Sequence, residues 1–199
     1  MMYSRSVLAL KTDRGIAATE IHCADDNFRT DRVNLMTSLM TSVETLAKLA
    51  VTRKRVIATA ESCTGGLIAG ACTEVSGSSA WFDRGFVTYS NNAKQLMLGV
   101  TDAVLQTHGA VSEATVIAMA EGAVARSDAN IAVSVSGVAG PTGGSAEKPV
   151  GTVWIACTGD GFASVASRFV FAGDRQSVRQ QAVENAVQLL ISCIDSDPL

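Results

Sequence analysis

The segment of this 199-residue chain best equipped for chemistry is AESCTGG, residues 60–66. The apolar run before it predicts a short buried strand over 55–60, and the small residues after it predict a helix from residue 67. Ser62 would then lie at a strand-to-helix junction, where unpaired N–H groups and the helix dipole stabilise developing negative charge. The segment therefore predicts a nucleophilic hydroxyl beside a site for an oxyanion. In the alternative interpretation, Ser62 or Thr64 is simply an N-cap.

A lysine in an unusual position could supply the base that such a serine needs. An alternating strand ends at Tyr89, and Ser90 or Asn91 is expected to cap a helix that carries Lys94 in its first turn. The dipole disfavours a cation there by up to roughly 1 kcal/mol, and this field, together with burial, lowers the pKa of an amine. A neutral lysine is a general base, and Tyr89 is close enough in sequence to orient it or relay a proton. Tyr89 as an ordinary strand aromatic and Lys94 as a surface charge remain open alternatives.

Other bases and nucleophiles are less well placed. The chain has two histidines: His22 lies in a polar stretch, and His108 precedes a glycine at an expected helix C-terminus, where histidine often acts only as a cap. A Ser-His-Asp triad would therefore depend on His108. Cys63 is a rival nucleophile, because a thiol at a helix N-terminus has a lowered pKa. In an extended segment, however, neighbouring side chains point to opposite sides, so only Ser62 or Cys63 would face the cleft.

Strands and helices are expected in an order typical of one layered domain. Strands are predicted at 55–60, 84–89, 131–135, 152–157 and 164–171. Helices are predicted at 35–50, from 67, from 91, at 113–126 after the cap Ser112, and from the cap Asp174 to 194. This order predicts an α/β protein, a three-layer α/β/α sandwich with a mixed β-sheet and a single domain.

The richest glycine run, residues 138–145, could bind a phosphate through consecutive N–H groups. It lacks the Gly-Lys-Ser/Thr ending of a Walker loop, so a flexible connection between two strands is an equal alternative. Arg84 and Arg175 are the best side-chain candidates for a phosphate, because the guanidinium fork suits its oxygens. Either arginine could instead form a structural salt bridge.

Composition limits the classes of function. A hydrophobic content of 47% suffices for one substantial core, and a net charge of −3 gives no electrostatic footprint for nucleic acid. The five cysteines form no Cys-x-x-Cys pair, which fits a reducing compartment and suggests neither a disulfide framework nor a zinc site. No run has transmembrane length, and no signal peptide is recognisable. We expect a cytoplasmic enzyme with no metal, no cofactor, and no nucleic-acid or membrane partner.

Seven motifs, in order along the chain, resemble the CinA (competence-damage-inducible protein) C-terminal domain family. They cover about residues 34 to 194 and lie at 60–66, 77–91, 108–112, 136–141, 143–145, 148–153 and 173–175. Several long motifs in order are more specific than one short pattern. The resemblance implies a nicotinamide-nucleotide amidohydrolase, which converts nicotinamide mononucleotide to nicotinic acid mononucleotide and ammonia.

The resemblance also implies roles for individual residues. Ser62 would be the nucleophile, with Lys94 and Tyr89 as the activating pair. The oxyanion would face N–H groups around residues 64–66, and Lys94 would protonate the departing ammonia before water hydrolyses the acyl-enzyme. Together with the chemistry of the two arginines and of the glycine run, the resemblance leads us to expect that the substrate is lined by Thr64, Gly65, Gly66, Arg84, Ser136, Gly137, Gly140, Gly143, Gly144 and Arg175.

The N-terminal residues differ from the rest, because charges interrupt any lasting apolar period over residues 1–32. We expect a loose extension there, or an upstream start codon with Met36 or Met40 as the genuine beginning, and the amidohydrolase-like domain over 33–196. A homodimer is possible, since the first and last helices are amphipathic. Two other functions remain open: a nucleotide-binding regulatory module without turnover, and an amidase for another small carboxamide.

Overall fold

The computed structural model describes residues 11–12, 15–16 and 26–196, and the side chains from residue 37 onward. The chain divides into two compact units, residues 1–36 and 37–199. In the first unit, β1 (Lys11–Thr12) pairs antiparallel with β2 (Gly15–Ile16). The other residues of the expected loose extension before Asp26 lie outside the described part of the chain. Helix α1 begins at Asp26, earlier than the apolar spacing from residue 35 predicted.

The second unit is an α/β/α sandwich around one five-stranded sheet. Its strands are β3 (Ile57–Glu61), β4 (Phe82–Val87), β5 (Ile131–Gly137), β6 (Thr152–Gly159) and β7 (Phe162–Val170). Its helices are α1 (Asp26–Thr52, from residue 37), α2 (Leu67–Thr73), α3 (Asn91–Leu98), α4 (Asp102–His108), α5 (Glu113–Ala125) and α6 (Arg175–Asp195), with a short 3-10 turn η1 (Ser78–Ala80). The predicted fold class is thereby confirmed.

The sheet has the order β4-β3-β5-β6-β7 and is mixed. Strands β4, β3 and β5 are parallel, whereas β6 and β7 continue the sheet antiparallel. Every residue of β3 is buried, as expected for a central strand covered by helices on both faces, while the edge strand β7 alternates between half-buried and exposed residues. The residues that follow β3, β4 and β5 therefore all lie at the carboxyl ends of these parallel strands, and they include the candidate catalytic residues.

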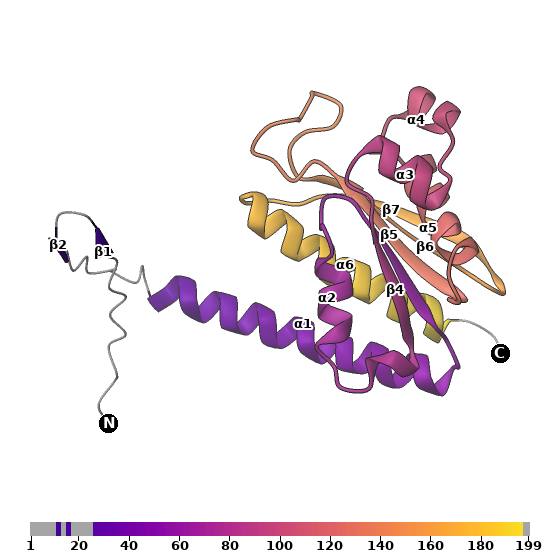
Figure 1. The fold of residues 1–199 in the computed structure, drawn as a ribbon, viewed down its shortest axis with the longest axis horizontal. Coiled ribbons are helices and arrows are strands. Elements are labelled where there is room, and N and C mark those ends of the chain that lie inside the picture. The colour runs from indigo at the N-terminus through magenta and orange to yellow at the C-terminus, as the bar shows by residue number, and fades with distance from the viewer. Residues whose placement is uncertain (1–10, 13–14, 17–25, 197–199) are drawn as a thin grey trace. The chain divides into compact units, whose positions relative to one another are not determined.

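Helices cover both faces of the five-stranded sheet (Figure 1), and the described residues form an apolar core on each face. One face of the sheet packs against α1, α2 and α6, through side chains that include Leu46, Ile68 and Leu190. The other face packs against α3, α4 and α5, through side chains that include Leu98 and Met119. Because strand side chains alternate between the two faces, the residues just after β3 can reach partners in either layer.

In the part of the chain that the structure describes, four helices begin with a side chain that accepts a hydrogen bond from the N–H three residues further on. These N-caps are Ser90, Thr101, Ser112 and Asp174. The predicted caps of α3, α5 and α6 are thus confirmed, and the bond fixes where each helix starts. The start of α3 matters most for chemistry, because it sets the position of Lys94 relative to the end of β4.

Candidate active site

A lysine amine and a serine hydroxyl meet at the carboxyl edge of the parallel strands. Lys94 Nζ lies 3.0 Å from Ser62 Oγ and donates a hydrogen bond of 2.8 Å to the carbonyl oxygen of Thr88. Lys94 is 1% exposed and Ser62 is 8% exposed, so both groups are largely withdrawn from bulk water. The two residues come from separate elements: Ser62 follows β3, and Lys94 belongs to α3.

Burial makes the Lys94 amine a base. It lowers the pKa of Lys94 from 10.5 to about 8, because the charged ammonium loses its hydration. No carboxylate of the described residues lies within ion-pair distance of the amine to restore the charge. A neutral amine that donates to Thr88 still has a lone pair, and the Ser62 hydroxyl is within reach to donate to it.

Neither Ser62 nor Thr64 is an N-cap of α2. The helix is capped at Gly66, which has a positive φ and no side-chain cap. The buried carboxylate of Glu61 instead accepts from the N–H groups of Gly66 (2.9 Å), Ile68 (3.1 Å) and Ala69 (2.8 Å). The start of this helix is therefore neutralised from within the protein and is not free for a substrate anion.

The peptide groups between Ser62 and Gly66 are largely occupied. Gly65 N–H donates to the carbonyl oxygen of Ser62 at 3.1 Å. The guanidinium of Arg179, on α6, donates to the carbonyl oxygens of Cys63 (3.0 Å) and Thr64 (2.8 Å). Two of the three N–H groups that were expected to bind the oxyanion, those of Gly65 and Gly66, therefore already have acceptors.

Tyr89 and Arg175 form a second group at the same edge. Arg175 donates from Nη2 to the Tyr89 hydroxyl at 3.0 Å and from Nη1 to the carbonyl oxygen of Gly140 at 2.9 Å. Tyr89 is 62% exposed, and the structure gives its hydroxyl Arg175 as its partner rather than Lys94 or Ser62. Since Tyr89 directly follows Thr88, the two groups are joined through one peptide bond.

The remaining glycine and serine candidates line the continuation of β5. Ser136 donates to the carbonyl oxygen of Ala110 at 2.7 Å, and Ser62 N–H donates to Val135, the residue before Ser136. A side chain at Gly137 would come within 2.7 Å of the Thr152 carbonyl oxygen, so a glycine is needed for that strand pair. Gly143 and Gly144 lie in the loop between β5 and β6, and an added side-chain carbon at either position would meet Val138 or Val150 rather than Ser62.

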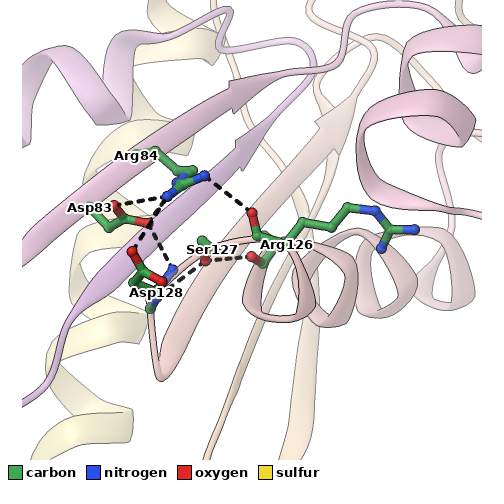
Figure 2. Close-up of polar contacts among 7 residues, drawn as sticks. Asp83, Arg84, Arg126, Ser127 and Asp128 are labelled. Carbon is green, nitrogen blue, oxygen red and sulfur yellow. Dashed lines mark hydrogen bonds and ion pairs between the residues drawn. The ribbon is translucent and has the colours of Figure 1, made fainter.

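Arg84 does not belong to this group of residues. Figure 2 shows its guanidinium between Asp83 and the turn that precedes β5. It donates to Asp83 at 2.6 Å and to the carbonyl oxygen of Arg126 at 3.4 Å, with Asp128 at 3.8 Å. That turn leads into the amino end of β5, so Arg84 lies toward the amino ends of the parallel strands, whereas Ser62 lies at their carboxyl ends. The structural salt bridge considered for Arg84 is what the structure contains.

The rival nucleophile Cys63 and the rival base His108 are not part of the Ser62–Lys94 pair. Cys63 is buried in the core on the α6 side, and burial raises the pKa of its thiol to about 11, so it is protonated at neutral pH. His108 is the last residue of α4, as predicted, and its carbonyl oxygen accepts from Lys148 at 3.2 Å. His108, Lys148 and Trp154 help line a cleft of about 560 Å³, which neither Ser62 nor Lys94 lines.

The described residues contain neither a candidate metal centre nor a membrane-spanning helix. No group of three potential metal ligands occurs among them. None of the helices in this part of the chain combines the length and apolarity needed to cross a bilayer.

The sequence matches a known family of proteins over most of its length. The family model of the CinA C-terminal domain matches residues 39–194. The chain belongs to this family. Nicotinamide-nucleotide amidohydrolase PncC of Escherichia coli (strain K12) is 51% identical over 152 residues, which are 76% of this chain and 92% of that protein. The protein of the same name from Pseudomonas putida is 56% identical over 135 residues, 68% of this chain and 84% of its own length.

Solved structures of the CinA family have the same fold. Competence/damage inducible protein CihA from Agrobacterium tumefaciens gives a TM-score of 0.73 at 48% identity, over 78% of this chain and 96% of its own. Competence damage-inducible protein A (ComA) from Klebsiella pneumoniae gives 0.76 at 39% identity, over 79% and 98%. The family resemblance given by the motifs is confirmed.

Two residues of the site were missed by the reading of the sequence. Glu61 lies inside the first motif but was passed over, although a carboxylate just before a helix is a familiar partner for free N–H groups. Arg179 lies four residues after Arg175, a spacing that places both on one face of α6. That spacing was the available signal, whereas its carbonyl partners, Cys63 and Thr64, could not be read from the sequence.

Proposed function

We propose that this protein hydrolyses the carboxamide of nicotinamide mononucleotide to nicotinic acid mononucleotide and ammonia, as part of pyridine nucleotide salvage. The observation that carries the proposal is the buried Lys94 amine 3.0 Å from Ser62 Oγ. Relatives at 51% and 56% identity bear the name nicotinamide-nucleotide amidohydrolase, which supports the choice of substrate. We place the amidohydrolase domain at residues 33–196.

In the proposed mechanism, Ser62 and Lys94 carry out two acyl transfers. Ser62 Oγ bonds to the carboxamide carbon while Lys94 Nζ takes the hydroxyl proton. The tetrahedral intermediate then loses its C–N bond, and the departing nitrogen takes the proton from Lys94 and leaves as ammonia. Water attacks the ester while Lys94 Nζ takes one of its protons. The bond between Ser62 Oγ and the acyl carbon then breaks, Ser62 Oγ takes that proton back from Lys94, and the carboxylic acid product loses its proton to water as it leaves. These steps use no metal, so we expect EDTA to leave turnover unchanged.

We propose that the ribose 5-phosphate end of the substrate binds beside Tyr89 and Arg175. Tyr89 lies just before α3, and Arg175 is the first residue of α6. The Arg175 guanidinium donates to the Tyr89 hydroxyl and is suited to phosphate oxygens. The carbonyl of Gly140 holds this guanidinium toward the loop that contains Gly143 and Gly144, which we include in the binding region. Arg84 is left out, since its guanidinium is bound to Asp83 and Arg126.

The decisive measurement is ammonia release from nicotinamide mononucleotide by the wild type, Ser62→Ala and Ser79→Ala. Ser79 is an exposed serine of η1 and serves as the matched control. We expect release by the wild type and by Ser79→Ala, and a loss of about 10³-fold or more in kcat for Ser62→Ala. Full activity of a folded Ser62→Ala protein would contradict the proposal.

The same assay separates the competing functions. Tight binding of nicotinamide mononucleotide without ammonia would indicate a regulatory module. Faster release of ammonia from nicotinamide riboside or from another small carboxamide would indicate a different amidase.

A further inference from the structure

We infer that Arg179 is a positioning residue for the oxyanion site, because it fixes the peptide groups that follow the nucleophile. This inference rests on the proposed acyl transfer at Ser62. Arg179 is part-buried on α6 and donates to two consecutive carbonyl oxygens, those of Cys63 and Thr64. Its partners are 116 and 115 residues away in the sequence. Helix α6 therefore holds residues 62–66, which we call the catalytic turn, from the layer opposite α3.

The directions of the N–H groups follow from the planarity of the peptide bond. In a trans peptide the carbonyl and the N–H of the next residue point in opposite directions. Arg179 holds the Cys63 carbonyl, so the Thr64 N–H points away from the guanidinium. Gly65 N–H holds the Ser62 carbonyl, so the Cys63 N–H likewise points away from that bond. Both orientations are set by contacts outside the reacting atoms.

The remaining N–H groups of the turn are occupied. Gly65 donates to Ser62, and Gly66 donates to the Glu61 carboxylate. In the described part of the chain, the N–H groups of Cys63 and Thr64 donate to no oxygen atom. Amides that follow a nucleophilic serine commonly stabilise the tetrahedral intermediate, and the loss of one such donor costs about 10²- to 10³-fold in kcat. The structure thus assigns the oxyanion site to Cys63 and Thr64 rather than to the glycines.

A second feature of Thr64 agrees with this assignment. Its side chain is fully buried, and its hydroxyl has no hydrogen-bond partner. Buried polar groups without partners are rare and mark places where strain, water or a ligand completes the structure. The turn after Ser62 is therefore held by Glu61 and Arg179, while its two central amides, those of Cys63 and Thr64, donate to no oxygen atom of the described residues.

The test is the rate at which a fluorophosphonate probe labels Ser62, measured by mass spectrometry of the peptide that contains it. The proteins are the wild type, Arg179→Lys and, as a matched control, Arg126→Lys at the end of α5. An ammonium cannot hold two carbonyls in the guanidinium geometry. We expect Arg179→Lys to react at least about tenfold more slowly, with the midpoint of its pH profile unchanged, and Arg126→Lys to react as the wild type does.

The outcomes distinguish the two proposals. Wild-type labelling without ammonia release from nicotinamide mononucleotide would overturn the proposed function and leave the labelling comparison valid. Equal labelling of the wild type and Arg179→Lys would overturn the role of Arg179. A shifted pH midpoint in Arg179→Lys would also overturn it, because the change would then have reached Lys94. Guanidinium ion should restore part of the rate to Arg179→Ala, and failure to do so in a folded variant would count against the inference.

Discussion

At the residue scale, the reactivity of Ser62 depends on the charge of one buried amine. Lys94 has a pKa lowered to about 8 by burial, so the fraction that can accept a proton rises tenfold per pH unit below that value. We predict that kcat/KM for ammonia release rises with pH and levels off above about pH 8. Lys94→Met should lower kcat by about 10³-fold or more. A rate independent of pH between about pH 6 and 9 would contradict this assignment of the base.

The two arginines proposed from the sequence can be separated by the same substitution. Arg175→Gln removes a charge beside Tyr89, and a charge-assisted hydrogen bond contributes about 1.5–3 kcal/mol. We predict that KM for nicotinamide mononucleotide rises about 10- to 100-fold, with kcat within about threefold of the wild type. Arg84→Gln, toward the amino ends of the parallel strands and away from Ser62, should leave KM unchanged. The reverse pattern in steady-state kinetics would place the phosphate at Arg84.

Tyr89 distinguishes substrate binding from proton relay. Its hydroxyl is bonded to Arg175 and its side chain is largely exposed, so Tyr89→Phe removes one partner of that guanidinium. We predict a rise in KM of about tenfold or less and a kcat within about threefold of the wild type. The activating role implied by the family resemblance predicts instead a fall in kcat by about 10²-fold or more at unchanged KM. Steady-state kinetics of this single variant decide between the two.

The residues that could be predicted from the sequence are those whose chemistry is local. Ser62 and Lys94 were found because each lies next to a strand end and a helix start, and their contact is present in the structure. Arg179 was missed because its partners are main-chain carbonyl oxygens more than 100 residues away. Arg84 was placed in the site because a guanidinium suits a phosphate anywhere, and only the fold shows that it is paired with Asp83.

At the scale of elements, strands and helices were well predicted from apolar spacing and caps, whereas their pairing was not. The sequence places β3, β4 and β5 in order along the chain, but in the sheet β3 lies between β4 and β5. No local pattern states this, since the order depends on how helices cross over the sheet. It nevertheless decides the site, because only a central β3 puts Ser62 between α3 and the end of β5.

The position of α3 depends on its packing against α5. A side chain at Gly122 would come within 2.0 Å of the carbonyl oxygen of Leu98, so α5 contacts the end of α3 closely. We predict that Gly122→Ala shifts α3, lowers the free energy of unfolding by about 1–3 kcal/mol and lowers kcat, because Lys94 moves relative to Ser62. Urea denaturation and ammonia release measure the two effects.

The control for this prediction is another helical glycine. Gly70 of α2 has nothing within 4 Å of an added side-chain carbon. Gly70→Ala should therefore leave kcat unchanged and stabilise the protein by about 0.5–1 kcal/mol. If Gly122→Ala behaved like Gly70→Ala in both measurements, close packing of α5 on α3 would not be what positions the lysine.

At the scale of the whole second unit, the site is assembled from both helical layers. Lys94 approaches Ser62 from α3 on one face of the sheet, and Arg179 approaches the same turn from α6 on the other face. The catalytic turn is therefore part of what joins the two layers, and activity and folding stability are coupled through it. Since the site includes a buried amine that is easier to deprotonate than in the unfolded chain, that coupling depends on pH.

We predict that Lys94 makes the unfolding free energy rise with pH. Its pKa is about 8 in the folded protein against 10.5 unperturbed, so between these values the unfolded chain binds more protons and deprotonation favours folding. The wild type should gain on the order of 2 kcal/mol relative to Lys94→Met across this range. The thiols of Cys63 and Cys72, whose pKa values burial raises, act in the opposite direction but are present in both proteins. Urea denaturation from about pH 7.5 to 10 measures the difference, and parallel curves for the two proteins would mean that Lys94 is not a buried base in the folded state.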